Sequence, residues 1–161
     1  MEKYFLHRIQ KENGTFTKGI EVHNTLESAK LAFWGRMKMA YGKNPAITFM
    51  SCKITDSNGN TIREYDKAWK SNSETENKFF LHHIRLDGET FDKDIDVLDS
   101  FNTACGNFAA QMEYGYGNAK HPNVAFVSCH ITDVLSGGMI LDSETWLRTS
   151  QEGDSLTNIQ M

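Results

Sequence analysis

Residues 4–22 alternate between apolar and polar positions in the manner of half-buried β-strands. In residues 16–22, apolar side chains and Lys18 share one parity, and polar residues or glycine occupy the other. Because successive side chains of a strand point to opposite faces, this pattern predicts a strand with one buried face. Residues 4–10 are interpreted as a second strand, and Glu12-Asn13-Gly14 between the two stretches has the composition of a turn.

The spacing of apolar residues then changes to three and four, which predicts an amphipathic helix. Thr25 or Asn24 is placed to cap its first turn, and Gly42 stands at the expected C-terminal cap. Residues 47–55 again favour a strand, and Asn58-Gly59 is a strong hairpin signal leading into residues 61–65. One apolar stripe of the helix comprises Leu26, Ala29, Phe33, Met37 and Ala40.

The whole pattern occurs twice. Phe5-Leu6-His7 recurs as Phe80-Leu81-His82, and the same ungapped offset gives 14 identities in 40 pairs from residue 4 onward. After two inserted residues, 7 of the 12 positions from Pro45 match those from Pro122. Self-similarity of this extent indicates an internal duplication. The second copy keeps the helix stripe, offers Asp99 or Ser100 as cap and Gly117 as C-terminal cap, and places Gly137-Gly138 at the hairpin.

The predicted fold is α+β, a tandem duplication of a β-β-α-β-β unit. Each unit forms a four-stranded, mainly antiparallel sheet whose apolar face is covered by one helix. We expect a first unit at 1–70, a linker at 71–77, a second unit at 78–147 and a polar C-terminal tail at 148–161. The units should be related by a pseudo-two-fold axis, as two layers or as one continuous eight-stranded sheet.

The amino-acid composition indicates the broad class of protein. The chain has 161 residues, of which 39% are hydrophobic and 24% charged, which is typical of a globular protein. Three cysteines without a secretory segment favour a cytoplasmic location, and no apolar run is long enough for a membrane span. Cys52 and Cys129 share parity with apolar neighbours and are expected to be buried.

Charge divides unevenly between the halves. Residues 1–77 carry 12 basic against 9 acidic side chains, whereas residues 78–161 carry 5 against 12. In the first helix, Trp34, Arg36 and Lys38 stand where the second has neutral or acidic residues. Drift after duplication is one explanation. The other is a partner-binding surface on one unit, or electrostatic complementarity within or between chains.

Several polar side chains recur at apolar positions of the two copies. Such a residue is either a hydrogen-bonded core residue or edge lysine, or a ligand contact contributed once by each unit. The aromatic and hydroxyl face that carries Lys53 either packs the units together or lines a ligand groove. The candidate ligand contacts are His7, Lys18, Lys53, Trp69, His82, Lys93, His130 and Trp146.

No motif for metal, phosphate or cofactor binding is present. The sequence lacks CxxC, HExxH and Gly-rich phosphate loops. The aspartates of residues 92–99 fail the calcium-loop pattern, because Val97 occupies the glycine position and Thr103 the position of the bidentate glutamate. We therefore expect no metal and no cofactor, and the negative net charge makes nucleic acid an improbable partner.

The duplicated chain resembles small duplicated proteins carried by bacteriophages and prophages. That resemblance implies a cytoplasmic protein of an infected bacterium that binds a host defence component or its nucleotide signal. The first hypothesis is a non-catalytic binding protein that sequesters a small anionic, nucleotide-like ligand. The second is a protein-interaction module that inhibits a host enzyme by masking its surface. The chain could also form a homo-oligomer. The third is an enzyme that uses histidine acid/base chemistry.

Overall fold

The computed structural model describes residues 2–41 and 44–148. The expected C-terminal cap Gly42 and the tail from residue 149 lie outside the described residues. The first unit contains β1 (Tyr4–Glu12), β2 (Thr15–His23), α1 (Leu26–Tyr41), β3 (Ile47–Asp56) and β4 (Thr61–Lys70). The second contains β5 (Phe79–Asp87), β6 (Thr90–Leu98), α2 (Phe101–Tyr116), the short 3₁₀ turn η1 (Asn118–Lys120), β7 (Val124–Asp133) and β8 (Ile140–Leu147).

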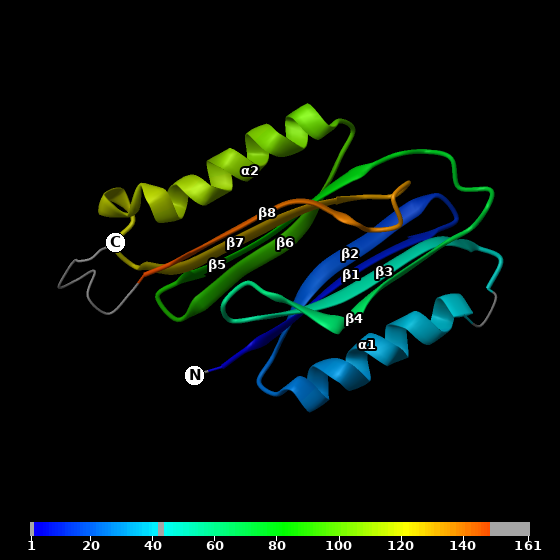
Figure 1. The fold of residues 1–161 in the computed structure, drawn as a ribbon, viewed down its shortest axis with the longest axis horizontal. Coiled ribbons are helices and arrows are strands. Elements are labelled where there is room, and N and C mark those ends of the chain that lie inside the picture. Colours follow the sequence, from blue (N-terminus) through cyan, green and yellow to red (C-terminus); the bar gives the residue numbers. More distant parts are fainter. Residues whose placement is uncertain (1, 42–43, 149–161) are drawn as a thin grey trace.

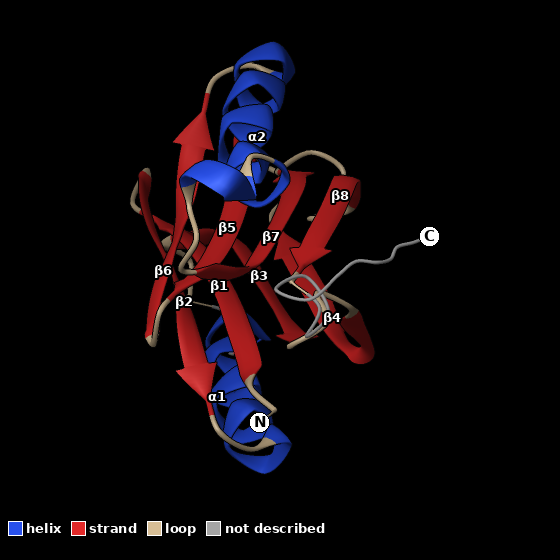
Figure 2. Cartoon of the chain, turned by 90° about the vertical axis from the view of Figure 1, so that its left-hand side faces the viewer, coloured by secondary structure: helices blue, strands red, loops and turns tan. Residues whose placement is uncertain are grey.

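Each unit forms its own antiparallel four-stranded sheet. The strand orders are β2-β1-β3-β4 and β6-β5-β7-β8, so the two copies share one topology. The sheets lie face to face between the two helices, giving the layer order α1, sheet, sheet, α2 (Figures 1 and 2). The predicted α+β fold of two sheet-and-helix units is confirmed, and of the two arrangements left open the protein adopts separate layers. The pseudo-two-fold relation stays a prediction.

Local signals place the helix ends. The Thr25 hydroxyl accepts a hydrogen bond from the Ser28 amide, 3.1 Å away, and Ser100 does the same for the amide of Thr103. Both therefore satisfy a backbone donor that the first helical turn leaves free. Gly117 caps the C-terminal end of α2 as expected. Strand β4 extends beyond the predicted residues 61–65, because it continues to pair with β3 as far as Lys70.

Three apolar cores fill the spaces between adjacent layers. One lies under α1 and a second under α2, and the third fills the space between the sheets. The inter-sheet core contains Phe5, Phe49, Phe80 and Phe126, each at most 5% exposed. The face of β3 that carries Phe49 therefore packs the units together, one of the two interpretations of the sequence pattern. No helix within residues 2–41 or 44–148 is long and apolar enough to cross a membrane.

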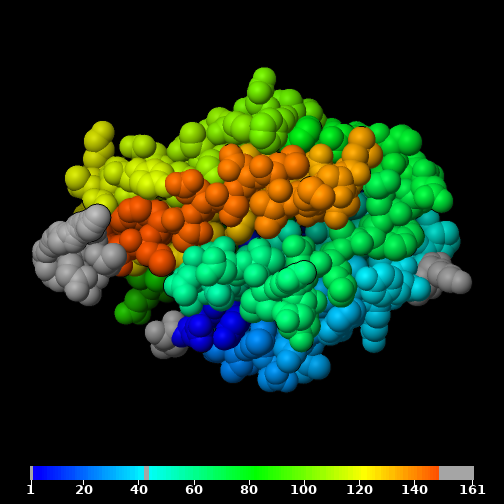
Figure 3. Space-filling model, viewed as in Figure 1, coloured from blue at the N-terminus to red at the C-terminus, as the bar shows by residue number. Residues whose placement is uncertain are grey.

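The hairpin glycines bring each turn against the opposite sheet. Gly59, in the β3–β4 turn, has a φ of 82°, and a Cβ there would lie 2.0 Å from the Thr145 hydroxyl oxygen of β8. Gly138, in the β7–β8 turn, has a φ of 83°, and its Cβ would lie 3.1 Å from Ser51 Oγ. Figure 3 shows β4 and β8 running along this face of the molecule. Glycine is required at both turns for backbone conformation and for close approach.

Two glycines of α2 should respond oppositely to substitution by alanine. At Gly115 a Cβ would lie 2.7 Å from the Trp146 ring, whereas at Gly106 nothing lies within 4 Å. We expect Gly115→Ala to destabilise the protein by about 1–3 kcal/mol through overpacking. Gly106→Ala should stabilise it by about 0.5–1 kcal/mol through helix propensity. Urea unfolding of the two variants measures both effects, and equal changes would contradict the packing of Trp146 against α2.

Candidate functional site

Four of the predicted ligand contacts converge between the sheets. His7 of β1 and His82 of β5 approach each other with 3.0 Å between their Nδ1 atoms. Lys53 lies opposite His7 in the β1–β3 register, and His130 lies opposite His82 in the β5–β7 register. The ring centroid of His130 is 5.8 Å from that of His7. These four side chains are called the histidine cluster below.

The histidine pair forms part of a hydrogen-bonded chain that crosses the interface. His7 Nε2 lies 2.9 Å from Thr55 Oγ1, and His82 Nε2 lies 2.9 Å from Thr132 Oγ1. A hydrogen bond between two Nδ1 atoms requires one to donate and the other to accept, so the neutral rings must be opposite tautomers. One threonine hydroxyl then donates to its histidine, and the other accepts from its own. All four ring nitrogens are thereby satisfied.

Lys53 and His130 occupy equivalent positions in the two units but make different contacts. The Lys53 ammonium lies 3.1 Å from Asp66 Oδ1 and donates to the Gly138 carbonyl at 3.4 Å. His130 Nδ1 lies 2.9 Å from the Ser143 hydroxyl, while its Nε2 is buried with no partner among the described residues. The duplication therefore places a paired cation on one side of the interface and an imidazole on the other.

The histidine cluster is sealed from solvent. His7, His82 and His130 are each 1% exposed and Lys53 is 0% exposed. Burial, followed by the neighbouring positive charges, holds the pKa of His7 and His82 well below the ordinary value and lowers that of His130 to about 4. The imidazoles are therefore neutral at pH 7. Their geometry is that of hydrogen-bonded core residues, and none of them lines the two hollows at the end of the sandwich where β1 begins.

The other predicted contacts lie apart from this cluster. Lys18 of β2 forms an ion pair with Asp94 of β6 at 3.5 Å, which joins the two sheets at their edges. Lys93 is half-buried on β6. Trp69 and Trp146 pack on the helix-covered faces of their sheets, under α1 and α2 respectively. The structure therefore does not assemble these four side chains with the histidines into one ligand site.

The residues of the predicted partner surface lie on α1, but not all of them face outward. Trp34 is 44% exposed and Lys38 is exposed. Arg36 is half-buried and lies 3.5 Å from the Glu21 carboxylate of β2.

Cys52 and Cys129 are buried as predicted, and burial raises the pKa of both thiols to about 12, so they are poor nucleophiles.

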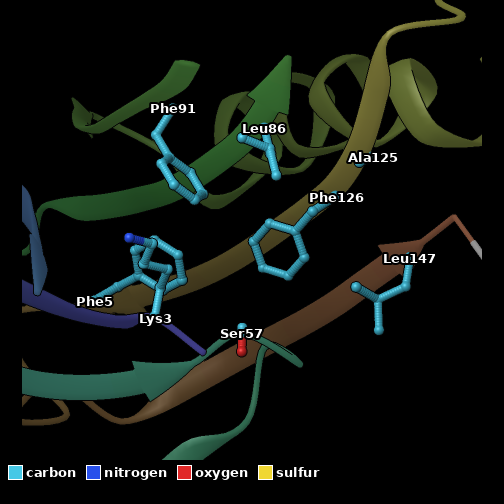
Figure 4. Close-up of a pocket in the computed structure, with 8 residues that line it drawn as sticks. All are labelled: Lys3, Phe5, Ser57, Leu86, Phe91, Ala125, Phe126 and Leu147. Atoms are coloured by element: carbon cyan, nitrogen blue, oxygen red, sulfur yellow. The ribbon is translucent and has the colours of Figure 1, made fainter. Parts of the chain in front are cut away.

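A pocket lies between the sheets at the end where β1 begins and β8 ends, and the sequence pattern did not indicate it. Its volume is about 190 Å³. Figure 4 shows the rings of Phe5, Phe91 and Phe126 around it, with Leu86 and Leu147 beside them. A wider hollow of about 580 Å³ shares Lys3, Leu86 and Phe91 with it and adds Gly88 and Glu89. The inter-sheet pocket, as named below, is lined by Lys3, Phe5, Ser57, Leu86, Phe91, Ala125, Phe126 and Leu147.

The opposite end of the sandwich is filled by different residues. Where the pocket has Leu86, the equivalent position carries Lys11, which is 8% exposed and whose ammonium lies 3.0 Å from the Glu74 carboxylate of the linker. Where the pocket has Ser57, the equivalent Val134 is 0% exposed and belongs to the inter-sheet core. The aromatic residues are repeated at both ends, so the hollow results from the substitutions around them.

Within the described residues, no three His, Cys, Asp or Glu side chains are grouped closely enough to hold a metal ion. Comparisons with protein-family models, with curated protein sequences and with solved structures found no match. The geometry of the chain is therefore the basis for the function proposed below.

Proposed function

We propose that this chain is a non-catalytic binding protein whose ligand occupies the inter-sheet pocket. The observation that carries the proposal is an aromatic-lined hollow between two otherwise closely packed sheets. Protein interiors leave few voids larger than a water molecule, and ligand pockets are concave, mostly apolar and supplied with a few polar groups. The pocket has this character, since Lys3 and Ser57 are the polar side chains among six apolar ones.

The proposed ligand site lies elsewhere than the site predicted from the sequence. A ligand held by the histidine cluster would have to reach four side chains that are each at most 1% exposed. An acid/base role for His7 or His82 would require a ring nitrogen within reach of a substrate, but each ring uses both nitrogens in protein hydrogen bonds. Binding at the pocket requires neither. That the ligand is a nucleotide-like signal of host defence stays a prediction.

Filling the pocket should abolish binding of a small apolar probe. Ala125 lines the pocket, so Ala125→Trp places an indole in the space a ligand would use. We expect 3-phenylpropanamide to bind the unmodified protein with a dissociation constant of about 1 mM, the affinity typical of a fragment of this size. In amide NMR spectra the shifts should centre on Phe5, Phe91 and Phe126 and should be lost in the variant.

The matched control is Ala110→Trp, which adds the same side chain at an exposed position of α2. That variant should keep both the affinity and the pattern of shifts. Shifts spread over the exposed helix faces, or equal binding by the two variants, would contradict the proposal. A panel of phenyl, indolyl and isobutyl amides is tested in the same way, so that the result does not depend on the fit of a single apolar group.

A protein-interaction role is a second candidate, favoured by one observation on α1. Leu31 and Trp34 are 78% and 44% exposed, and the equivalent positions of α2 hold Gly106 and Ala109. Large exposed apolar residues at positions where the duplicated unit has none are typical of a partner surface rather than of the fold. Charge reversal at Lys38 separates the two candidates. It should weaken binding of a protein partner and leave binding of the apolar probe unchanged, because Lys38 lies on α1 and does not line the pocket.

A further inference from the structure

The charge around the inter-sheet pocket is unbalanced. Among the residues that the structure describes, Lys3 is the only charged one that lines it, and the same lysine also borders the wider outer hollow. Its ammonium donates a hydrogen bond to the Asn24 side-chain carbonyl. Among the described residues no carboxylate lies within 4.0 Å of it. An ammonium has three donors, and a neutral amide supplies no compensating charge.

In the second unit, the equivalent lysine is paired with acidic side chains. Lys78, the equivalent of Lys3, is hydrogen-bonded to Asp99, the equivalent of Asn24. It also lies 3.4 Å from the Glu76 carboxylate of the linker. The duplicated lysine therefore has two acidic partners at the filled end of the sandwich and a neutral partner at the end with the pocket.

We infer that the ligand of the pocket is an amphipathic monoanion, a carboxylate attached to an aromatic or branched aliphatic body. This inference rests on the proposed function and names its ligand class. The body would pack among Phe5, Phe91 and Phe126, and the carboxylate would accept a hydrogen bond from Lys3. A polyphosphate fits less well, because the pocket offers one cation and Glu89 borders the outer hollow.

The test compares 3-phenylpropionate with 3-phenylpropanamide, which share one body and differ in charge. We expect the carboxylate to bind the unmodified protein about tenfold more tightly, as a charge-assisted hydrogen bond at a partly exposed lysine allows. Lys3→Gln should bring the two affinities together. Asn24→Asp, which reproduces the pairing of Lys78 with Asp99, should do the same while leaving Lys3 in place.

Lys78→Gln is the matched control, since Lys78 lies at the equivalent position outside the pocket. This variant should keep the tenfold preference for the carboxylate. Equal affinities for the two probes in the unmodified protein would overturn the inferred ligand class and leave the proposed function standing. Failure of 3-phenylpropionate and of every amide of the panel to shift the backbone amide signals of the pocket would overturn the proposed function, and the ligand class with it.

Discussion

Lowering the pH from about 7.5 to about 5.5 should destabilise the folded protein by about 3–4 kcal/mol, because three histidines are buried in their neutral form. In the unfolded chain these imidazoles titrate near the ordinary pKa of 6.5 and bind protons over this range. In the folded protein the pKa of each is depressed, so no proton is taken up. Each histidine therefore costs about 1 kcal/mol of stability over this range, and stability is highest above pH 6.5.

The charged groups around the cluster reinforce this direction. Lys53 faces both His7 and His82 with a positive charge, and the Asp66 carboxylate that opposes it is partly exposed. Protonation of both rings would also break the bond between the two Nδ1 atoms, because two imidazolium rings leave no acceptor. The acidic groups with lowered pKa, Glu21, Glu74 and Glu76, titrate below 4.5 and contribute little above pH 5.5.

Urea unfolding at several pH values measures the effect. His130→Gln, which can keep the hydrogen bond to Ser143, should remove about a third of the pH dependence. An unfolding free energy that is flat over this pH range would show that the histidines are accessible to protons in the folded protein.

Phe80→Ala should cost about 3–5 kcal/mol, the range for removing a large side chain from a rigid core. Phe80 is 0% exposed, stacks on Phe49 with 5.9 Å between ring centroids, and meets the edge of Phe16 at 5.4 Å. It therefore joins the two sheets at the filled end of the sandwich. Neighbouring side chains on both sheets are held by backbone pairing, so we expect only partial collapse of the cavity.

Phe101→Ala is the matched control for Phe80→Ala. Phe101 is 40% exposed at the start of α2, and its loss should cost less than about 1 kcal/mol. The two costs are read from the urea midpoints at constant m-value. A cost for Phe80→Ala as small as that of the control would mean that the sheets are not held together by the inter-sheet core.

The strands and helices could be predicted from sequence because their signals are local. The alternation of residues 16–22, the stripe of α1 and the caps Thr25 and Ser100 depend on neighbours within one or two turns. Because the unit is duplicated, each of these signals occurs twice in the chain. Strand β4 was predicted too short because three of its last five residues are charged. These residues are held by pairing with β3, which a period-two pattern does not reveal.

The site was less predictable, because it depends on what covers each face. The pattern correctly placed His7 and Lys53 on a face with apolar neighbours, but an apolar position describes a core and a ligand groove equally well. Packing of the sheets brings His7 and His82, 75 residues apart, to within 3.0 Å and makes them core residues. The pocket was missed because its lining comes from both sheets and from positions that are ordinary in each strand.

By itself, the sequence determined two copies of a β-β-α-β-β unit, the apolar stripe of each helix and two candidate caps at each helix start, since side-chain direction within an element follows local spacing. Only the tertiary structure decided that the units meet sheet to sheet, that the doubled histidines are sealed between them, and that one end is filled by Lys11 and Glu74 while the other stays hollow beside Lys3. These outcomes depend on side chains distant in the chain, whose packing and charge no local pattern specifies.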